Sequence, residues 1–399
     1  MKSGPAAPAG HGGTLPPSGG SRIAGKSDTS SPVRLTARLL PVVARYGTLI
    51  VLVGLLILFS ILSLVELGEQ RFLTGTNLTL ILRQAAVLSI LAGGVTVVLV
   101  MGEFDLSITG GLTLGGAIFA LALEGSYVLT WPTIPGTDVG GGAILPDSLQ
   151  ASVGFAILLG IVFGIVVGLL NGFVVAHLRV SAFIGTLGMA GLIEGYLLRL
   201  GGGGVSIPVR SDVVDFARGS LFGWESGDHW EIGPLDLAGL TVPLIAVLAV
   251  GVLSALWVFL NLTEAGRRID AVGGNAEAAR LAGINVSRYR MLAFVITGAT
   301  AAVAGLALAG GRSGFASTLA ANQGSFLLQA YTACFLGAVT LREGEFHIVG
   351  TGVGALLMTT TTSGLIIIGV PGYGQILATG GILIVALAVS GVARRHQTL

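Results

Sequence analysis

The chain has 399 residues, of which 53% are hydrophobic and only 10% are charged, and its formal net charge is +1. Soluble domains carry about 25% charged residues, so this chain lacks the charge to cover a soluble surface of its size, and its near-zero net charge argues against nucleic acid as a partner. The composition predicts an all-α integral membrane protein whose exterior is covered by lipid. Its 64 glycines fit helices that approach one another closely in lipid.

The first 45 residues are rich in Gly, Pro and Ser, and we expect residues 1–45 to form a disordered cytoplasmic tail. This tail contains GSRIAGKS, from Gly20 to Ser27, which fits the phosphate-loop pattern of nucleotide-binding proteins. Such a loop needs a strand before it and a helix after it, so that its backbone N–H groups point at phosphates. Here a Gly/Pro/Ser tail precedes the pattern and DTSSP follows it, so we interpret it as a chance match.

Ten segments after the tail are long and apolar enough to cross a bilayer, which requires roughly 20 residues each. They predict a transmembrane domain over residues 46–393 and a short cytoplasmic tail over 394–399. The single cysteine, Cys334, lies in one of these segments, which fits a small buried apolar side chain and leaves no disulfide or metal framework within the chain. The expected spans are 46–67, 78–100, 108–131, 151–178, 181–200, 239–261, 291–311, 325–341, 346–370 and 373–393.

The charges predict how these spans are oriented, because cytoplasmic loops carry an excess of Lys and Arg. The N-terminal tail has six basic residues against one acidic residue, so both termini of a ten-span bundle are expected in the cytoplasm. The loops 176–181, 262–290 and 341–346 would then also lie inside. The loops 132–150 and 201–238 would lie outside, and acidic residues outnumber basic ones in both.

The loop 262–290 is far more polar than the spans on either side, with five arginines and three acidic residues. Within it, Asn275 is a good N-cap, the residues from Ala276 to Ala282 favour a helix, and Gly283 fits the left-handed position that ends one. Two helical turns are not stable alone, so we expect the surface of a partner chain to hold this helix. The alternative is an amphipathic helix at the lipid interface. The apolar face of this helix is mostly alanine, which anchors a helix to lipid only weakly.

Three stretches of the chain carry a resemblance to a known family. They are AGRRIDAVGGNAEAARLAGINVSRYRMLAFVITG (265–298), GEFDLSITG (102–110) and LLNGFVVAHLRVSAFIGTLG (169–188). Together they resemble the permeases of bacterial ABC importers for ribose, xylose and other simple sugars, within the branched-chain-amino-acid-like permease superfamily. The similarity covers roughly residues 75–390, with the motifs in the same order.

The resemblance implies a multi-pass permease subunit of the bacterial plasma membrane that imports a simple sugar, with a pentose such as xylose or ribose favoured. It implies a second permease subunit, expected to be an identical copy, together with ABC ATPase subunits and an extracytoplasmic sugar-binding protein. ATP and Mg would be bound by the ATPase, so this chain would hold no cofactor or metal and would have no catalytic residue. The residues expected to couple to the ATPase are Arg267, Arg268, Asn275, Glu277, Ala278, Ala279, Arg280 and Gly283.

The candidates for a translocation path are polar residues near the ends of spans, Glu194 in the middle of one, and two phenylalanines beside them, because polar groups are costly in lipid and usually face a cavity or a partner. The candidates are Glu103, Phe104, Asp105, Ser107, Asn171, Phe183, Thr186 and Glu194. Carboxylates and the amide could bind sugar hydroxyls, and Phe183 could stack on the C–H face of a sugar. The alternatives are an interfacial turn in which Asp105 caps the next helix, helix packing at Asn171, and an ion pair between Glu194 and Arg83. Two departures from the family, at Glu194 and in REGEFHIVG (342–350), weaken the assignment of the substrate.

A rival interpretation is an ion-gradient-driven secondary transporter of a small polar solute, which would need paired intramembrane charges and no coupling helix. An intramembrane enzyme is a weaker rival, because the sequence lacks HExxH, G-x-S-x-G or a cluster of His and Asp. The coupling interpretation alone explains the polar loop. It predicts that a bulky charged residue at Ala279 or Gly283 abolishes transport while the bundle stays folded.

Overall fold

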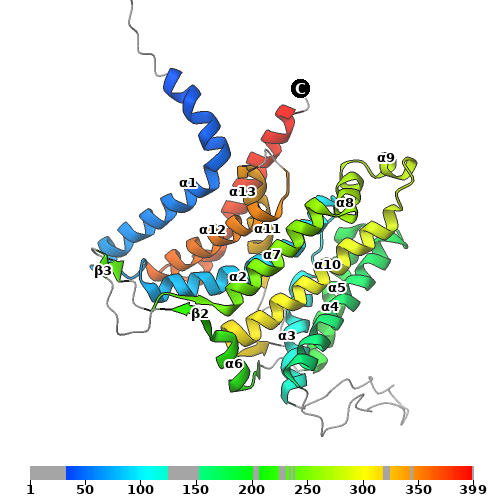
Figure 1. Cartoon of the computed structure of the whole chain (residues 1–399), viewed down its shortest axis with the longest axis horizontal. Coiled ribbons are helices and arrows are strands. Elements are labelled where there is room, and N and C mark those ends of the chain that lie inside the picture. Colours follow the sequence, from blue (N-terminus) through cyan, green and yellow to red (C-terminus); the bar gives the residue numbers. More distant parts are fainter. Residues whose placement is uncertain are drawn as a thin grey trace, which may run out of the picture. The chain divides into compact units, whose positions relative to one another are not determined.

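The computed structural model describes residues 33–124, 152–200, 206–223, 231–232, 235–236, 239–317, 324–341 and 345–397 (Figure 1). The helices are α1 (Val33–Leu67), α2 (Gly75–Val100), α3 (Ile108–Glu124), α4 (Val153–Ala176), α5 (Ala182–Leu200), α6 (Ser211–Arg218), α7 (Leu244–Leu262), α8 (Glu264–Gly274), α9 (Ala276–Leu281), α10 (Val286–Leu306), the π-helix η1 (Ala307–Ser313), α11 (Gly324–Leu341), α12 (Ile348–Ile367) and α13 (Gly372–Gln397). The short strands are β1 (Ser206–Pro208), β2 (Ser220–Gly223), β3 (Glu231–Ile232), β4 (Leu235–Asp236), β5 (Thr241–Pro243) and β6 (Phe315–Ser317).

The prediction of an all-α membrane protein is confirmed. Among the described residues, seven helical segments are long and apolar enough to cross a bilayer: α1 from Ile50, α2, α4, α5, α7, α10 together with η1, and α12. Shorter apolar helices lie in α3, α11 and α13, so a helix stands at each of the ten expected spans. The expected end of the third span, 125–131, and the loop 132–150 lie outside the described residues.

Helix α1 begins earlier than the sequence predicted. We expected residues 33–45 to belong to a disordered tail, but the structure includes them in α1. The stretch RLTARLL at the start of this helix consists mainly of good helix formers, which gives a physical reason for the earlier start. Residues 1–32, with the phosphate-loop-like pattern, lie outside the described residues.

Close backbone contacts hold the centre of the bundle together. Helix α10 contacts α2, α3 and α4, and its Gly298 lies against Gly164 of α4. A Cβ added at Gly298 would stand 2.2 Å from the carbonyl oxygen of Gly164, so any larger residue would push the two helices apart. Small residues allow this approach where no hydrophobic effect drives helices together in lipid. Cys334 of α11 is buried and free, as predicted.

One end of α2 contacts the residue that follows the loop 201–238, and the other end contacts the loop 262–290. The charge pattern placed these two loops on opposite sides of the membrane. Near its first end, the hydroxyl of Thr79 donates to the carbonyl of Gly239, at 3.1 Å. At its other end, Gly273 of α8 lies against the carbonyl of Val100. Figure 1 shows α8 and α9 at one end of α7 and α10, and β2 near the other end. The arrangement fits the expected sidedness of the two loops.

The described parts of the loop 201–238 form short secondary structure that the sequence did not predict. Strand β1 pairs antiparallel with β6, with Ile207 opposite Ala316, and β2 pairs with β5. The pairing of β1 with β6 ties this loop to the chain that follows α10. Such strands of two to four residues lack a periodic signal of their own and depend on contacts distant in sequence.

Candidate functional site

The loop between α2 and α3, residues 101–107, begins with a tight helix C-cap. Gly102 has a φ of +78°, its N–H donates to the carbonyl of Leu99 at 3.0 Å, and the N–H of Glu103 donates to the carbonyl of Val98 at 2.9 Å. This is a Schellman-type end, for which glycine supplies the left-handed conformation. The turn stops α2 and directs the next residues back into the bundle.

Asp105 is the buried centre of this loop, with 2% of its surface exposed. Its Oδ1 accepts hydrogen bonds from the N–H of Ser107 at 2.9 Å and from the Ser107 hydroxyl at 2.7 Å. Its backbone is held as well, because the Tyr331 hydroxyl accepts from the Asp105 N–H and donates to the Asp105 carbonyl, each at 2.9 Å. Burial raises the pKa of Asp105 to about 6, although the two bonds from Ser107 lower it.

We expect Asp105→Asn to remove a pH dependence of thermal stability. Because the folded-state pKa is about 6 and the ordinary value is 3.8, the folded protein binds this proton more tightly than the unfolded chain. The stabilisation is complete below the ordinary value and is lost as the pH rises through about 6. The asparagine Oδ1 still accepts both bonds from Ser107, so the fold is kept. Apparent Tm measured in detergent from about pH 5 to about pH 8 should fall for the wild type and less for the variant; parallel curves would contradict the assignment.

Two further candidates from the sequence join this loop. Asn171 of α4 donates from Nδ2 to the Ser107 hydroxyl at 2.7 Å, and Thr186 of α5 accepts from the N–H of Leu106 at 3.0 Å. Their exposed fractions are 1% and 0%. The structure therefore brings Asp105, Ser107, Asn171 and Thr186 together as a buried clamp between the 101–107 loop, α4 and α5, and Tyr331 joins α11 to it. They are closed to substrate in this conformation.

The remaining path candidates take no part in the hydrogen bonds of this clamp. Phe104 is 41% exposed and stacks on Tyr331, with ring centroids 5.8 Å apart. Glu103 forms an ion pair with Arg290 of α10 at 2.9 Å; burial raises the pKa of Glu103, and Arg290 opposes that shift. Phe183 is 55% exposed on α5.

The ion pair between Glu194 and Arg83, which was the alternative interpretation of Glu194, does not occur among the described residues. Arg83 instead donates to the carbonyl of Arg218 at 3.0 Å. Glu194 is half-buried on α5, so the structure does not bring it to the clamp.

The polar loop 262–290 contains two helices, of which the sequence predicted one. For α9, the Asn275 side chain accepts from the N–H groups of Glu277 and Ala278, and Gly283 has a φ of +83° just after the helix. Both predicted ends of the helix are thus confirmed. Helix α8 was not predicted, and it ends at Gly273-Gly274, where glycine has a low helix propensity.

The expectation that the short helix depends on a partner chain for its support is wrong, because it packs on the bundle. Ile269 and Val272 of α8 are 0% and 2% exposed, and Ala279 of α9 is 6% exposed in the same buried cluster as Met101 and Tyr289. Arg268 donates to the Tyr289 hydroxyl at 2.6 Å and pairs with Glu264. The bundle itself therefore holds both helices in place.

The outward face of α9 is defined by the residues that this packing leaves exposed. Glu277 and Arg280 form an exposed ion pair, and Ala278 is exposed beside them. Leu281 has 82% of its surface exposed, more than any other large apolar side chain that the structure describes. Leu281 was not among the predicted coupling residues, because contacts with other parts of the chain decide which face of a six-residue helix is exposed.

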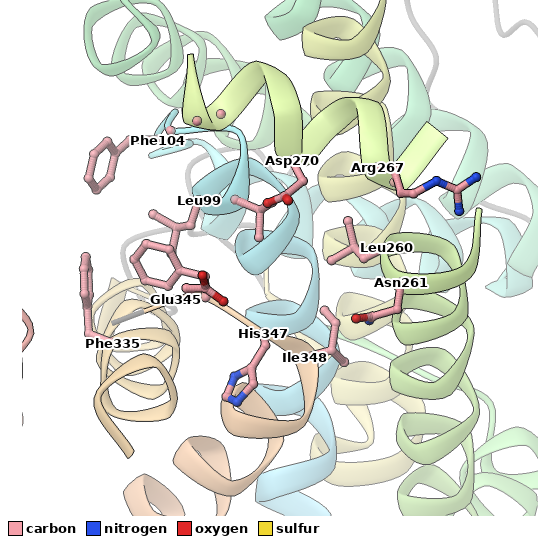
Figure 2. A pocket seen from close by; sticks show the side chains of 16 residues that line it. Leu99, Phe104, Leu260, Asn261, Arg267, Asp270, Phe335, Glu345, His347 and Ile348 are labelled. Carbon is pink, nitrogen blue, oxygen red and sulfur yellow. The ribbon is translucent and has the colours of Figure 1, made fainter. Parts of the chain in front are cut away.

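A cavity of about 640 Å³ lies beneath α8, and we call it the α8 cavity. Figure 2 shows Phe104 and Phe335 on one side of it and Leu260, Asn261 and Ile348 on the other. Its titratable side chains include Arg267, Asp270, Glu345 and His347. No group of three or more His, Cys, Asp or Glu that could hold a metal ion occurs among the described residues.

Comparison with known proteins gives consistent matches over most of the chain. The family model described as "Branched-chain amino acid transport system / permease component" matches residues 77–387. The chain is 32% identical over 339 residues to the ribose import permease protein RbsC of Escherichia coli K12, which covers 85% of this chain and 92% of that protein. No solved structure matches the chain.

Two other relatives carry different sugars in their names. The galactose/methyl galactoside import permease protein MglC of Salmonella typhimurium is 29% identical over 339 residues, covering 84% of this chain and 92% of that protein. The xylose transport system permease protein XylH of Escherichia coli K12 is 29% identical over 372 residues, covering 82% of this chain and 88% of that protein.

Proposed function

This chain belongs to the family of permease components of branched-chain amino acid transport systems, and we propose that it is the membrane-spanning subunit of an ATP-driven importer of a simple sugar. Its relatives named for ribose, galactose and xylose support the sugar class. A pentose is favoured as the substrate. The protein is a multi-pass protein of the plasma membrane, and ATP hydrolysis belongs to a separate subunit that binds ATP and Mg.

The single observation that carries the proposal is the exposed face of α9. A helix of six residues is stable only with tertiary support, and here Ala279 anchors it to the bundle while Leu281 faces outward. An apolar side chain that is 82% exposed beside an ion pair on a rigid support is suited to a partner's pocket. The partner that fits a family member is an ABC ATPase subunit.

The complete importer would contain a second permease subunit, ATPase subunits on the α8–α9 side and an extracytoplasmic sugar-binding protein. The second permease subunit is proposed to be an identical copy. The sugar would pass from the binding protein into the membrane domain, which alternates between outward-facing and inward-facing states as the ATPase subunits close and open.

The contacts at the end of α2 offer a route by which movement of α8 reaches the membrane domain. Gly273 of α8 lies against the carbonyl of Val100, and a Cβ there would be 1.9 Å from that oxygen. Beyond Val100, the 101–107 loop is bonded to Tyr331 of α11 and Thr186 of α5. A displacement of α8 would therefore act on the loop that clamps α4, α5 and α11.

The proposal is tested by purifying the tagged chain from its native membrane in mild detergent and identifying co-purified proteins by mass spectrometry. An ABC ATPase should be recovered, and the reconstituted complex should accumulate labelled ribose, xylose or galactose only with ATP. A chain that is recovered without an ATPase and still transports under an ion gradient would establish the secondary-transporter alternative instead.

A further inference from the structure

A second hollow of the molecule is an apolar groove between α2, α7 and α12, with a volume of about 650 Å³. We call it the α2–α7–α12 groove. Its walls are formed almost entirely by apolar side chains, among them Ala86, Ala249, Leu253 and Leu356. Ser254, which also lines the groove, is exposed on α7. Because α7 is a membrane-spanning candidate, the groove lies at the depth of the bilayer core.

The length of the groove fits one leaflet of the membrane. On α7 it runs from Ala246 to Val258, which at 1.5 Å per residue is about 18 Å. Half of a hydrocarbon core of about 30 Å is about 15 Å, which is the reach of one lipid acyl chain. The groove ends one turn before α7 does, at Trp257 and Val258, and Trp is enriched at membrane interfaces. This end is the predicted cytoplasmic end, so the groove fits a chain of the cytoplasmic leaflet.

The α8 cavity begins where the groove ends. Leu260 and Asn261 of α7 line the cavity, and Ile348 lines both the cavity and the groove. The apolar α2–α7–α12 groove within the bilayer thus continues into the polar α8 cavity at the membrane surface. Figure 2 shows Asn261 and Ile348 near each other, with Arg267 and Asp270 of α8 above them. A continuous site of this kind has the polarity profile of a phospholipid, with its tail in the groove and its head in the cavity.

The charges of the cavity select the kind of head group. Within the described part of the chain, the Arg267 guanidinium donates to the carbonyl of Leu262 at 3.4 Å, and a guanidinium carries five N–H donors, so others can bind a ligand. Asp270 and Glu345 are exposed, and neither forms an ion pair within the described part of the chain. A head that carries a phosphate and an ammonium group would meet a cation and two carboxylates. A purely anionic head would be repelled by the two acids.

We propose that the α2–α7–α12 groove and the α8 cavity together bind one phospholipid of the cytoplasmic leaflet with a zwitterionic, amine-bearing head. The acyl chain lies along α7, the phosphate binds Arg267, and the ammonium binds Asp270 and Glu345. Bound in this way, the head group fills the space between α8 and the start of α12. The lipid therefore supports the segment that the ATPase is proposed to contact. A second copy of this chain is a poorer occupant, because an apolar helix has no charged groups to pair with Arg267, Asp270 and Glu345 at the end of the groove.

The site is tested by reconstituting the full chain in nanodiscs of phosphatidylethanolamine and phosphatidylglycerol and counting retained lipids by native mass spectrometry. The wild type should keep one phosphatidylethanolamine after mild activation. Ser254→Phe, at an exposed position inside the groove, should reduce that retention roughly tenfold, because an added ring occupies the acyl chain's place. The matched control is Ala255→Phe, since Ala255 is the next residue of α7, is also exposed and does not line the groove.

The head-group assignment is tested separately with Asp270→Asn combined with Glu345→Gln. This double variant should lose the preference for phosphatidylethanolamine over phosphatidylglycerol, whereas Arg267→Gln should weaken retention of both by roughly tenfold. Equal retention in Ser254→Phe and Ala255→Phe would overturn the proposal. A change of oligomeric state in Ser254→Phe, visible in the same spectra, with lipid content unchanged would show that a second copy occupies the groove.

Discussion

Leu281→Glu should abolish recovery of the ATPase and sugar uptake while the protein reaches the membrane in normal amounts. The side chain is 82% exposed in the isolated chain, so a glutamate there adds no buried charge to the bundle. In a complex, the same carboxylate would enter an apolar pocket without a partner. Losing a central apolar anchor typically costs about 2 kcal/mol or more, which is at least roughly a thirtyfold loss of affinity. Pull-down and uptake measured side by side check this result.

The control for this experiment is Leu281→Met, which keeps an apolar side chain of similar volume and should retain most of the activity. Uptake at the wild-type rate in Leu281→Glu would remove α9 as the coupling helix. Ala279, which the sequence selected for the same purpose, gives a poorer test. Its side chain faces the bundle, so a bulky charge there would dislodge α9 instead of probing the contact surface.

The α8–α9 segment illustrates how much of a site local sequence rules can predict. Asn275 and Gly283 mark the ends of α9 through preferences of the backbone, which act within a few residues, and both were predicted. Which face of α9 is outward depends on Met101 and Tyr289, with which Ala279 shares a buried cluster. Met101 lies in the loop after α2 and Tyr289 lies on α10, so the difference between buried Ala279 and exposed Leu281 was not available from the sequence.

At the clamp around Asp105, too, contacts between residues distant in sequence could not be predicted. The sequence grouped Asp105, Ser107, Asn171 and Thr186 as candidates because polar residues near span ends are unusual in lipid. It could not tell whether they face a path or one another. Tyr331, which holds the Asp105 backbone through two hydrogen bonds, was missed because a tyrosine in an apolar span carries no signal of its partner 226 residues away.

Gly273→Ala should separate ATPase binding from transport. A Cβ at Gly273 would stand 1.9 Å from the carbonyl oxygen of Val100 and 3.1 Å from the Cα of Met101. Neither neighbour is a flexible side chain, so α8 must move away from the end of α2. The exposed face of α9 is untouched by this change. We therefore expect the ATPase to be recovered normally while uptake falls roughly tenfold or more, the scale of a strain of 1–3 kcal/mol.

Gly274→Ala is the matched control, because a Cβ on this neighbouring glycine would meet nothing within 4 Å. It should bind the ATPase and transport at close to the wild-type rate. ATP hydrolysis by the purified complex gives the third readout, and in Gly273→Ala it should continue without sugar accumulation. Normal uptake in Gly273→Ala would show that the contact between α8 and α2 does not transmit movement of α8 to the membrane domain. In that case the ATPase must act on the membrane domain through α10, which joins the α8–α9 segment to the centre of the bundle by direct chain connection and by the bond between Arg268 and Tyr289.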